Sequence, residues 1–319
     1  MIFRKLFLAI STLWGIVTVL FCLLTALGDP AQMLAGQRAD ISTIESIRQE
    51  LGLDQPLPIQ YVQYLNDLSP IGILSQKEKE TGYYHFLSII NLNTNALVIK
   101  IPYLRRSFQT NRPVLEMFLE RLPGTMLLAF SRLAYAFLIG VSLGMICAYK
   151  ENSFIDKILL NISSLCISIP SFCTALLLIW IFAVVLQPFT HLGTSGYITQ
   201  QAIFEDVTYY HWANLLLPSI ALSIRPFAIL FQLTRTYLIE ILQLDYIRTA
   251  RSKGISEYKI LIFHALPNPL NPILTATMSW LAALMAGAFF IETLFDWYGI
   301  GKLTIDSLFT NDYPILIGG

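Results

Sequence analysis

Long apolar stretches dominate the pattern of this chain. Five of them approach the roughly 20 residues that a helix needs to cross a bilayer core about 30 Å thick. A helix pairs its own backbone groups, so such stretches can lie in lipid. The five predicted spans are residues 6–27, 124–148, 158–186, 212–237 and 273–294. The pattern therefore predicts an all-α integral membrane protein.

The first apolar stretch follows Arg4 and Lys5, which would suit a signal peptide as well as a retained anchor. Cleavable signals usually have an apolar region of about 7–15 residues. Because this stretch is longer, the pattern favours an N-terminal transmembrane anchor over residues 1–27.

Basic residues are unevenly distributed among the short loops. Positively charged residues are retained on the cytoplasmic side of a membrane. With a cytoplasmic N-terminus, the short outer loops 187–211 and 295–313 contain only Lys302. The inner segments contain Arg4, Lys5, Lys150, Lys157, Arg235, Arg248, Arg251, Lys253 and Lys259. We therefore expect a multi-pass protein whose N-terminus is cytoplasmic.

The polar segment 28–123 is then an extracytoplasmic subdomain. Ser42 and Glu45 have the spacing of a capping box, which predicts a short helix there. A second helix is predicted from near Pro58 to before Ser69, and residues 97–101 resemble a short strand that ends at Pro102. Two interpretations stay open for this subdomain: a space-filling lid, or a docking surface for an extracytoplasmic partner.

The amino-acid composition narrows the classes of protein to which this chain can belong. Hydrophobic residues make up 55% of the chain and charged residues 13%, against about 25% charged in soluble domains. Lys+Arg and Asp+Glu are 21 each, so there is no basic excess for nucleic acid. The four cysteines lie in apolar stretches, without the spacing of a disulfide framework or a zinc site.

Catalytic motifs are missing from the sequence. The four histidines form no H-x-x-x-H pair, and no G-x-S-x-G sequence occurs. Residues 299–303 resemble a phosphate loop but lack its leading glycine and have Leu303 where Ser or Thr should bind magnesium. We therefore expect no enzyme activity in this chain. A stand-alone carrier or channel remains an alternative.

The cytoplasmic loop 239–271 contains two predicted short helices, which we call the elbow (residues 245–267). Asp245 is predicted to cap the first helix, and Gly254 to end it in a left-handed conformation. The second is predicted from Ser256, with Glu257 in its first turn, to Pro267. Pro269 and Pro272 are expected to prevent helix before the fifth span. On physical grounds alone, an ordinary positively charged loop is also possible.

Ala250, Gly254 and Leu266-Pro267 have the spacing of the EAA loop of ABC importer permeases, E-A-A-x3-G-x9-I-x-L-P. The departures are Arg248-Thr249 in place of Glu-Ala, and His264 in place of the isoleucine. The string at 245–254 resembles the B-type subunit of the dipeptide/oligopeptide permease family. Further matches lie at 28–30, 50–57, 112–116, 120–123, 168–172, 233–235, 292–295, 299–301 and 312–314.

The resemblance implies one transmembrane subunit of a type I-like importer in the bacterial inner membrane. Its implied partners are a second related permease, two cytoplasmic ATPases that use ATP and magnesium, an extracytoplasmic solute-binding protein, and lipid. The chain itself would bind no cofactor or metal. The cargo would be dipeptides or oligopeptides, with nickel complexes and glutathione as alternatives.

The resemblance also implies that the elbow docks into a cleft of the ATPase as a coupling helix. The residues carried over to this role are Asp245, Arg248, Thr249, Ala250, Arg251, Gly254, Ser256, Glu257, Leu266 and Pro267. Small residues would matter there, because a bulky side chain would hold the two surfaces apart.

Two departures from the family concern the chain as a whole. The family continues into a sixth span after the 312–314 match, whereas only residues 315–319 follow here, so the permease core 124–319 is expected to be truncated. The stretch of about 71–104 is longer than the family's link and is expected to be an insertion in the 28–123 subdomain.

Five residues are candidates for the translocation pathway or its gate. Charges inside a membrane are costly and are functional candidates by default. Arg225 could meet a peptide carboxylate, with the adjacent Pro226 bending its helix, and Arg132 is a second intramembrane arginine. Glu292 would shape an outer gate or pair with a neighbour, and Pro170 would kink the third span. A structural role is the alternative for each.

Overall fold

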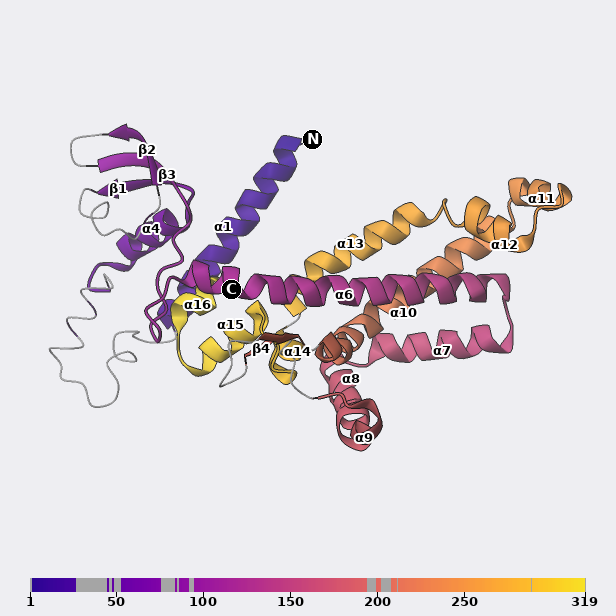
Figure 1. Ribbon diagram of the computed structural model, residues 1–319. Coiled ribbons are helices and arrows are strands. Elements are labelled where there is room, and N and C mark those ends of the chain that lie inside the picture. The colour runs from indigo at the N-terminus through magenta and orange to yellow at the C-terminus, as the bar shows by residue number, and fades with distance from the viewer. Residues whose placement is uncertain are drawn as a thin grey trace. The chain divides into compact units, whose positions relative to one another are not determined.

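The computed structural model describes residues 2–26, 45, 48, 53–75, 84, 86–91, 95–193, 199–201, 208–210, 212–287 and 289–318. The chain forms two compact units (Figure 1). The first comprises Met1–Glu120 with Asp306–Gly319, and the second comprises Arg121–Ile305. Ser42 of the predicted capping box lies outside the described residues.

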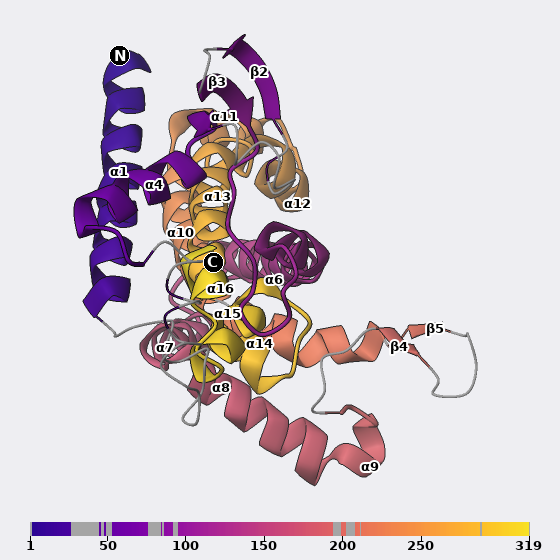
Figure 2. The ribbon, with the colours of Figure 1, turned by 90° about the vertical axis from the view of Figure 1, so that its left-hand side faces the viewer.

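In the first unit, helix α4 (Leu57–Leu68) packs against helix α1 (Ile2–Ala26). The hydroxyls of Thr18 and Tyr61 are 2.7 Å apart. The ring of Phe21 lies 5.2 Å from that of Tyr61 and 5.6 Å from that of Tyr64. Figure 2 shows the two helices side by side. The second helix predicted for the polar segment is therefore confirmed, and it rests on the N-terminal helix.

A three-stranded antiparallel sheet follows α4. Its strands are β1 (Ile71–Ser75), β2 (Phe86–Asn91) and β3 (Asn95–Lys100), in the order β1-β3-β2. Leu74, Ala96 and Val98 form its buried face. The predicted strand at 97–101 is thus the central strand, one or two residues earlier than expected. The whole sheet lies within the range 71–104 that the family resemblance suggests is an insertion.

Asp312 connects the two segments of the first unit. Its buried carboxylate accepts hydrogen bonds from the Ser107 hydroxyl at 2.5 Å and from the Phe108 amide at 3.0 Å. Helix α16 (Tyr313–Gly318) follows it directly. Residues 312–314, one of the segments that resemble the permease family, therefore make a buried polar contact with the loop before residue 113.

The second unit is helical, apart from a short pair of strands, β4 (Thr199–Gln201) and β5 (Thr208–Tyr210). Helix α10 has apolar contacts with α8 and α13 and lies among the other long helices (Figure 1). The helices are α6 (Val114–Tyr149), α7 (Phe154–Ser168), α8 (Ser171–Leu178), η1 (Ile179–Val185), α9 (Gln187–Thr190), η2 (Trp212–Leu215), α10 (Leu216–Leu242), α11 (Asp245–Ser252), α12 (Glu257–Lys259), η3 (Ile260–Ala265), α13 (Leu270–Gly287), α14 (Phe289–Leu294) and α15 (Ile300–Phe309).

Three helices in the described part are long and apolar enough to cross a membrane: Phe3–Leu23, Val114–Tyr149 and Trp212–Leu242. They confirm the first, second and fourth predicted spans. The predicted third span, 158–186, consists of two helices, Phe154–Ser168 and Ser171–Val185, which meet at 109° at the proline expected to kink it. Counted as one span, this bent pair is a fourth candidate. The predicted fifth span is not confirmed.

Two prolines explain how the helices differ from the expected ones. Pro170 is the N-cap of α8, and its ring disfavours helical backbone at Ile169, so α7 ends there and the expected kink is a complete break. The expectation that Pro269 and Pro272 prevent helix before residue 273 is wrong for Pro272, since α13 begins at Leu270. Pro272 lies in the first turn, where a backbone N–H would have no helical partner anyway.

Helices α6 and α10 approach each other closely at two glycines. A Cβ atom on Gly144 would lie 2.7 Å from Thr234 Cβ and 2.9 Å from the Phe231 carbonyl oxygen, and one on Gly140 would lie 3.0 Å from the Phe227 carbonyl oxygen. Small residues four positions apart allow helices to pack in lipid, where burial from water gives no driving force.

We expect Gly144→Leu to destabilise the second unit by about 1–3 kcal/mol, the usual cost of overpacking. The lost contact between α6 and α10 should lower the unfolding temperature in detergent. Gly15→Leu is the matched control, because a Cβ at Gly15 meets no described atom within 4 Å. Equal unfolding temperatures for the two variants would contradict the close packing.

Candidate functional site

The elbow begins directly after α10. Only Gln243 and Leu244 separate α10 from α11, and the N-cap is Leu244. The prediction that Asp245 caps this helix is therefore off by one residue. Asp245 lies in the first turn, where a negative charge favours the helix dipole. In Figure 1, α11 and α12 lie at one end of α10, and α14 lies at the other end.

Gly254 has the left-handed backbone that the sequence predicts, with φ +76°. Its amide donates to the Arg251 carbonyl at 2.9 Å, and α11 ends there. A Cβ at this position would meet no described atom within 4 Å. Within this chain, glycine is therefore required by the backbone conformation and not by a shortage of space.

The second part of the elbow differs from a simple helix. Ser256 is the N-cap, as predicted, although its side chain donates and accepts no capping hydrogen bond in the described structure. Helix α12 has only one turn and continues as the π-helix η3 to Ala265, with Leu266 as its C-cap. The helix thus ends immediately before Pro267, as the sequence predicts.

The inner face of the elbow is apolar. Ile247 and Ala250 are buried in a cluster that connects α11 with the ends of α6 and α10 and with η3. The other buried members are Ala148, Leu238, Ile260 and Ala265. The small side chain of Ala250 is therefore used for packing inside this chain.

Polar contacts fix the two helices of the elbow to each other. Arg251 donates to both carboxylate oxygens of Glu257, at 2.8 and 3.3 Å. The Tyr246 hydroxyl lies 2.5 Å from Asn268 Nδ2 and 3.4 Å from the His264 carbonyl oxygen. These contacts connect α11 to α12 and to the start of α13. The elbow therefore connects α10 to α13 through a folded two-helix unit.

The outer face of α11 is polar and exposed. Asp245 and Arg248 form an ion pair at 3.3 Å, with exposed fractions of 95% and 71%. Such an exposed pair adds little stability. Thr249 and Ser252 are also exposed on this helix. The folding of the elbow thus depends on its inner face, and its outer face is available for contact.

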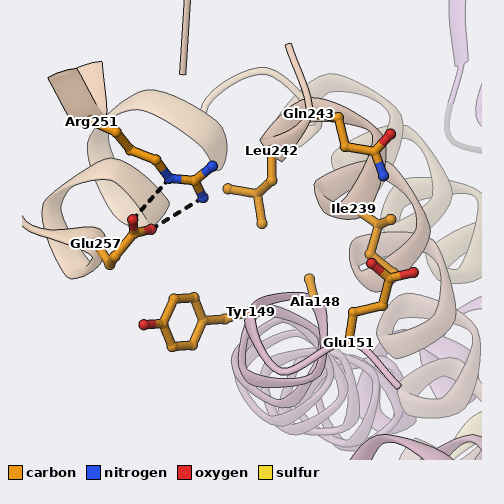
Figure 3. Close-up of a pocket in the computed structure, with 8 residues that line it drawn as sticks. All are labelled: Ala148, Tyr149, Glu151, Ile239, Leu242, Gln243, Arg251 and Glu257. Atoms are coloured by element: carbon orange, nitrogen blue, oxygen red, sulfur yellow. Dashed lines mark hydrogen bonds and ion pairs between the residues drawn. The ribbon is translucent and has the colours of Figure 1, made fainter. Parts of the chain in front are cut away.

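A hollow of about 440 Å³ lies between the elbow and the ends of α6 and α10. Figure 3 shows Arg251 and Glu257 on one side and residues from the end of α6 on another. The lining residues are Ala148, Tyr149, Glu151, Ile239, Leu242, Gln243, Arg251 and Glu257. The hollow is polar at its rim and adjoins the apolar cluster.

The pathway candidates do not form one cluster. Arg225 is exposed on α10, where the helix continues through the buried Pro226. Arg132 on α6 is 5% exposed and donates to the Trp280 carbonyl oxygen at 3.1 Å. Of the two arginines, only Arg225 is accessible from outside the chain.

Glu292 is fully buried and holds the N-terminus of α15. Its carboxylate accepts hydrogen bonds from the Thr125 hydroxyl at 2.8 Å and from the Lys302 amide at 3.1 Å. A Cβ on Gly299 would lie 2.2 Å from this carboxylate. A negative charge at a helix N-terminus is favourable. These contacts favour the structural role of Glu292.

Sequence reasoning missed a buried ion pair between α7 and α10. Arg235 donates to both carboxylate oxygens of Asp156, at 2.5 and 2.6 Å. In the sequence, Asp156 resembles any other acidic residue near the start of a helix, so nothing marks it as the partner of Arg235. The spacing of Gly140 and Gly144, in contrast, is a signal that could have predicted the α6–α10 contact.

Two family models together match nearly the whole chain. The N-terminal model of binding-protein-dependent transport system membrane components matches residues 1–129. The model of the binding-protein-dependent transport system inner membrane component matches residues 140–319. The chain belongs to this permease family. It is a multi-pass inner-membrane protein.

Curated relatives identify the permease as a peptide ABC transporter permease. The dipeptide transport system permease protein DppB of Alkalihalophilus pseudofirmus is 32% identical over 99% of this chain and 90% of its own length. The probable D,D-dipeptide transport system permease protein DdpB of Escherichia coli is 33% identical over 96% and 87%. The glutathione transport system permease protein GsiC of Pectobacterium atrosepticum is 32% identical over 98% and 88%.

Replacement of Glu292 by alanine should destabilise the permease strongly. The Thr125 hydroxyl and the Lys302 amide would lose their buried acceptor, at about 1–3 kcal/mol for each unsatisfied group. The unfolding temperature in detergent measures this loss. Glu257→Ala is the control, because Glu257 and its partner Arg251 are both partly exposed, and such a pair adds little stability. A smaller effect at Glu292 than at Glu257 would contradict the structural role.

Proposed function

We propose that this permease is one transmembrane subunit of an ATP-driven importer of dipeptides or oligopeptides, and that the elbow is its coupling element. The observation that carries the proposal is the elbow itself, a folded two-helix unit with an apolar inner face and an exposed polar outer face. Its position between α10 and α13 supports this role, since a force on α11 would reach both helices.

The proposed energy source is a pair of cytoplasmic ATPases that use ATP and magnesium. When they close, they would push on the outer face of α11. The buried cluster joins α11 to α10, and Tyr246 joins it to Asn268 just before α13, so the displacement passes to both helices. Because α10 packs on α6, the movement would reach several helices and open the pathway alternately to each side.

The proposed assembly also contains a second related permease and an extracytoplasmic solute-binding protein. The N-terminus would be cytoplasmic, which places the elbow on the same side as the ATPases. The chain would bind no cofactor of its own. Peptides are the proposed cargo because two of the compared relatives are named for dipeptides; glutathione, the cargo in the name of a third relative, and nickel complexes are the alternatives.

We expect Gly254→Val to abolish substrate-stimulated ATP hydrolysis and import while membrane insertion stays normal. A β-branched residue is strained at positive φ and adds bulk to the face that would meet the ATPase. The measurement is ATPase activity and uptake by the reconstituted complex. Gly15→Val, on α1, is the matched control. Normal import by the Gly254 variant would rule out the coupling role.

Arg225→Ala and Arg225→Lys test the pathway role. If the exposed guanidinium meets a peptide carboxylate, both variants should assemble but take up free peptides less well than peptides with an amidated C-terminus, with the larger effect for alanine. Competition uptake assays measure this preference. An unchanged preference in both variants would leave Arg225 with a structural role only.

A stand-alone carrier or channel is the competing function. Proteoliposomes that contain the permease without ATPases distinguish the two. Peptide flux in these vesicles would overturn the proposed function, whereas flux only with ATPases and ATP supports it.

A further inference from the structure

Helix α7 is held to α10 by a buried ion pair that the coupling role of the elbow does not use. Arg235 Nε lies 2.5 Å from Asp156 Oδ1, and Arg235 Nη2 lies 2.6 Å from Asp156 Oδ2. The side chains are 15% and 1% exposed. Two parallel hydrogen bonds between a guanidinium and a carboxylate fix orientation as well as distance.

The carboxylate is itself fixed at the start of α7. Asp156 Oδ2 also accepts the Asn152 amide at 2.9 Å, and the Asp156 amide donates to the Ser153 hydroxyl of the N-cap at 3.2 Å. Asp156 therefore cannot follow Arg235 without moving the first turn of α7. Any shift of Arg235 is passed to the helix as a whole.

A second, weaker contact also joins α7 and α10. The Gln232 side-chain amide donates to the Ser163 hydroxyl at 2.9 Å. This bond joins uncharged groups, which contribute less than a charged pair. Breaking a buried ion pair by removing one charge is strongly unfavourable, because the other charge stays buried. Of these two bonds, the Asp156–Arg235 pair is therefore the one that would cost more to break.

The pair lies close to the elbow. Arg235 is about 10 Å from the end of α10 at 1.5 Å per residue, and Leu238 on the next turn belongs to the same buried cluster as Ile247 of α11. The contact of α6 with α10 is made by Gly140 and Gly144 and by apolar side chains such as Val141 and Leu230. Of these two contacts of α10, the one with α7 contains the ion pair.

We propose that the Asp156–Arg235 pair makes α7 move together with α10, so that displacement of the elbow reaches the broken helix pair α7–α8. Both residues are positioning residues, because neither is proposed to contact cargo. Helix α8 packs on α10 through Ala175, Leu217 and Ala221. The helices on both sides of Pro170, α7 and α8, therefore contact α10. The inference rests on the proposed function, since it requires an ATPase to move the elbow.

Distance measurements test the inference in the assembled complex. Spin labels at Lys157→Cys on α7 and Glu240→Cys on α10, in a background without the four native cysteines, report whether the helices move together. Both positions are exposed. We expect this distance to stay the same with and without ATP in the parent protein, and to change with ATP when Asp156 is replaced by asparagine.

A second measurement separates failure of the inference from failure of the proposed function. The parent complex is reconstituted in proteoliposomes, and peptide uptake is measured with and without ATP. If ATP drives no uptake, the proposed function fails. If ATP drives uptake while the α7–α10 distance also changes in the parent protein, the inference is overturned and the function stands.

Uptake measurements provide an independent readout. We expect Asp156→Asn to lower the number of peptides imported per ATP by about tenfold, equivalent to about 1.4 kcal/mol in the competition between productive and unproductive ATP cycles. Arg235→Lys keeps the charge but loses the paired hydrogen bonds, so its loss should be smaller. Lys157→Gln, on the exposed side of α7, should behave as the parent. A normal ratio in Asp156→Asn, or failure of both pair variants to assemble, would overturn the proposal.

Discussion

The close approach of α10 to α6 is the contact on which the larger unit depends. Side chains on membrane helices gain little by leaving lipid for protein, so association relies on shape and on polar bonds. Gly140 and Gly144 remove the atoms that would keep the two backbones apart. Helix α10 can then lie deep among its neighbours, with α7 tied to one part of it and α8 packed on another.

The elbow continues this arrangement to the end of α10. Its buried residues complete a cluster begun by Ala148 on α6 and Leu238 on α10. Its ion pair joins α11 to α12, and Tyr246 connects it to Asn268 just before α13. The same segment therefore has two kinds of surface. The inner one joins helices of this permease, and the outer one, with Asp245 and Arg248, is exposed.

Much of this could be predicted from the sequence, because apolar length and turn residues act locally. The helices at 6–27, 124–148 and 212–237 follow from hydropathy, and the left-handed Gly254 follows from its position after a helical stretch. Contacts between distant residues could not be predicted. Asp156 and Arg235 lie 79 residues apart, and Glu292 and Thr125 lie 167 apart. The abrupt turn at Pro170 also depends on what α8 packs against.

A glycine is usually required both by a left-handed backbone and by a lack of space for a side chain, but at position 254 only the first requirement applies. Its backbone is left-handed, yet the space where a side chain would project is open within this chain. The mirror-image form of alanine has its low-energy conformation in that region, so it would suit the fold of the elbow as well as glycine does. Semisynthesis with D-alanine would thus leave the permease intact and add a single methyl group to the surface that the ATPase is proposed to contact.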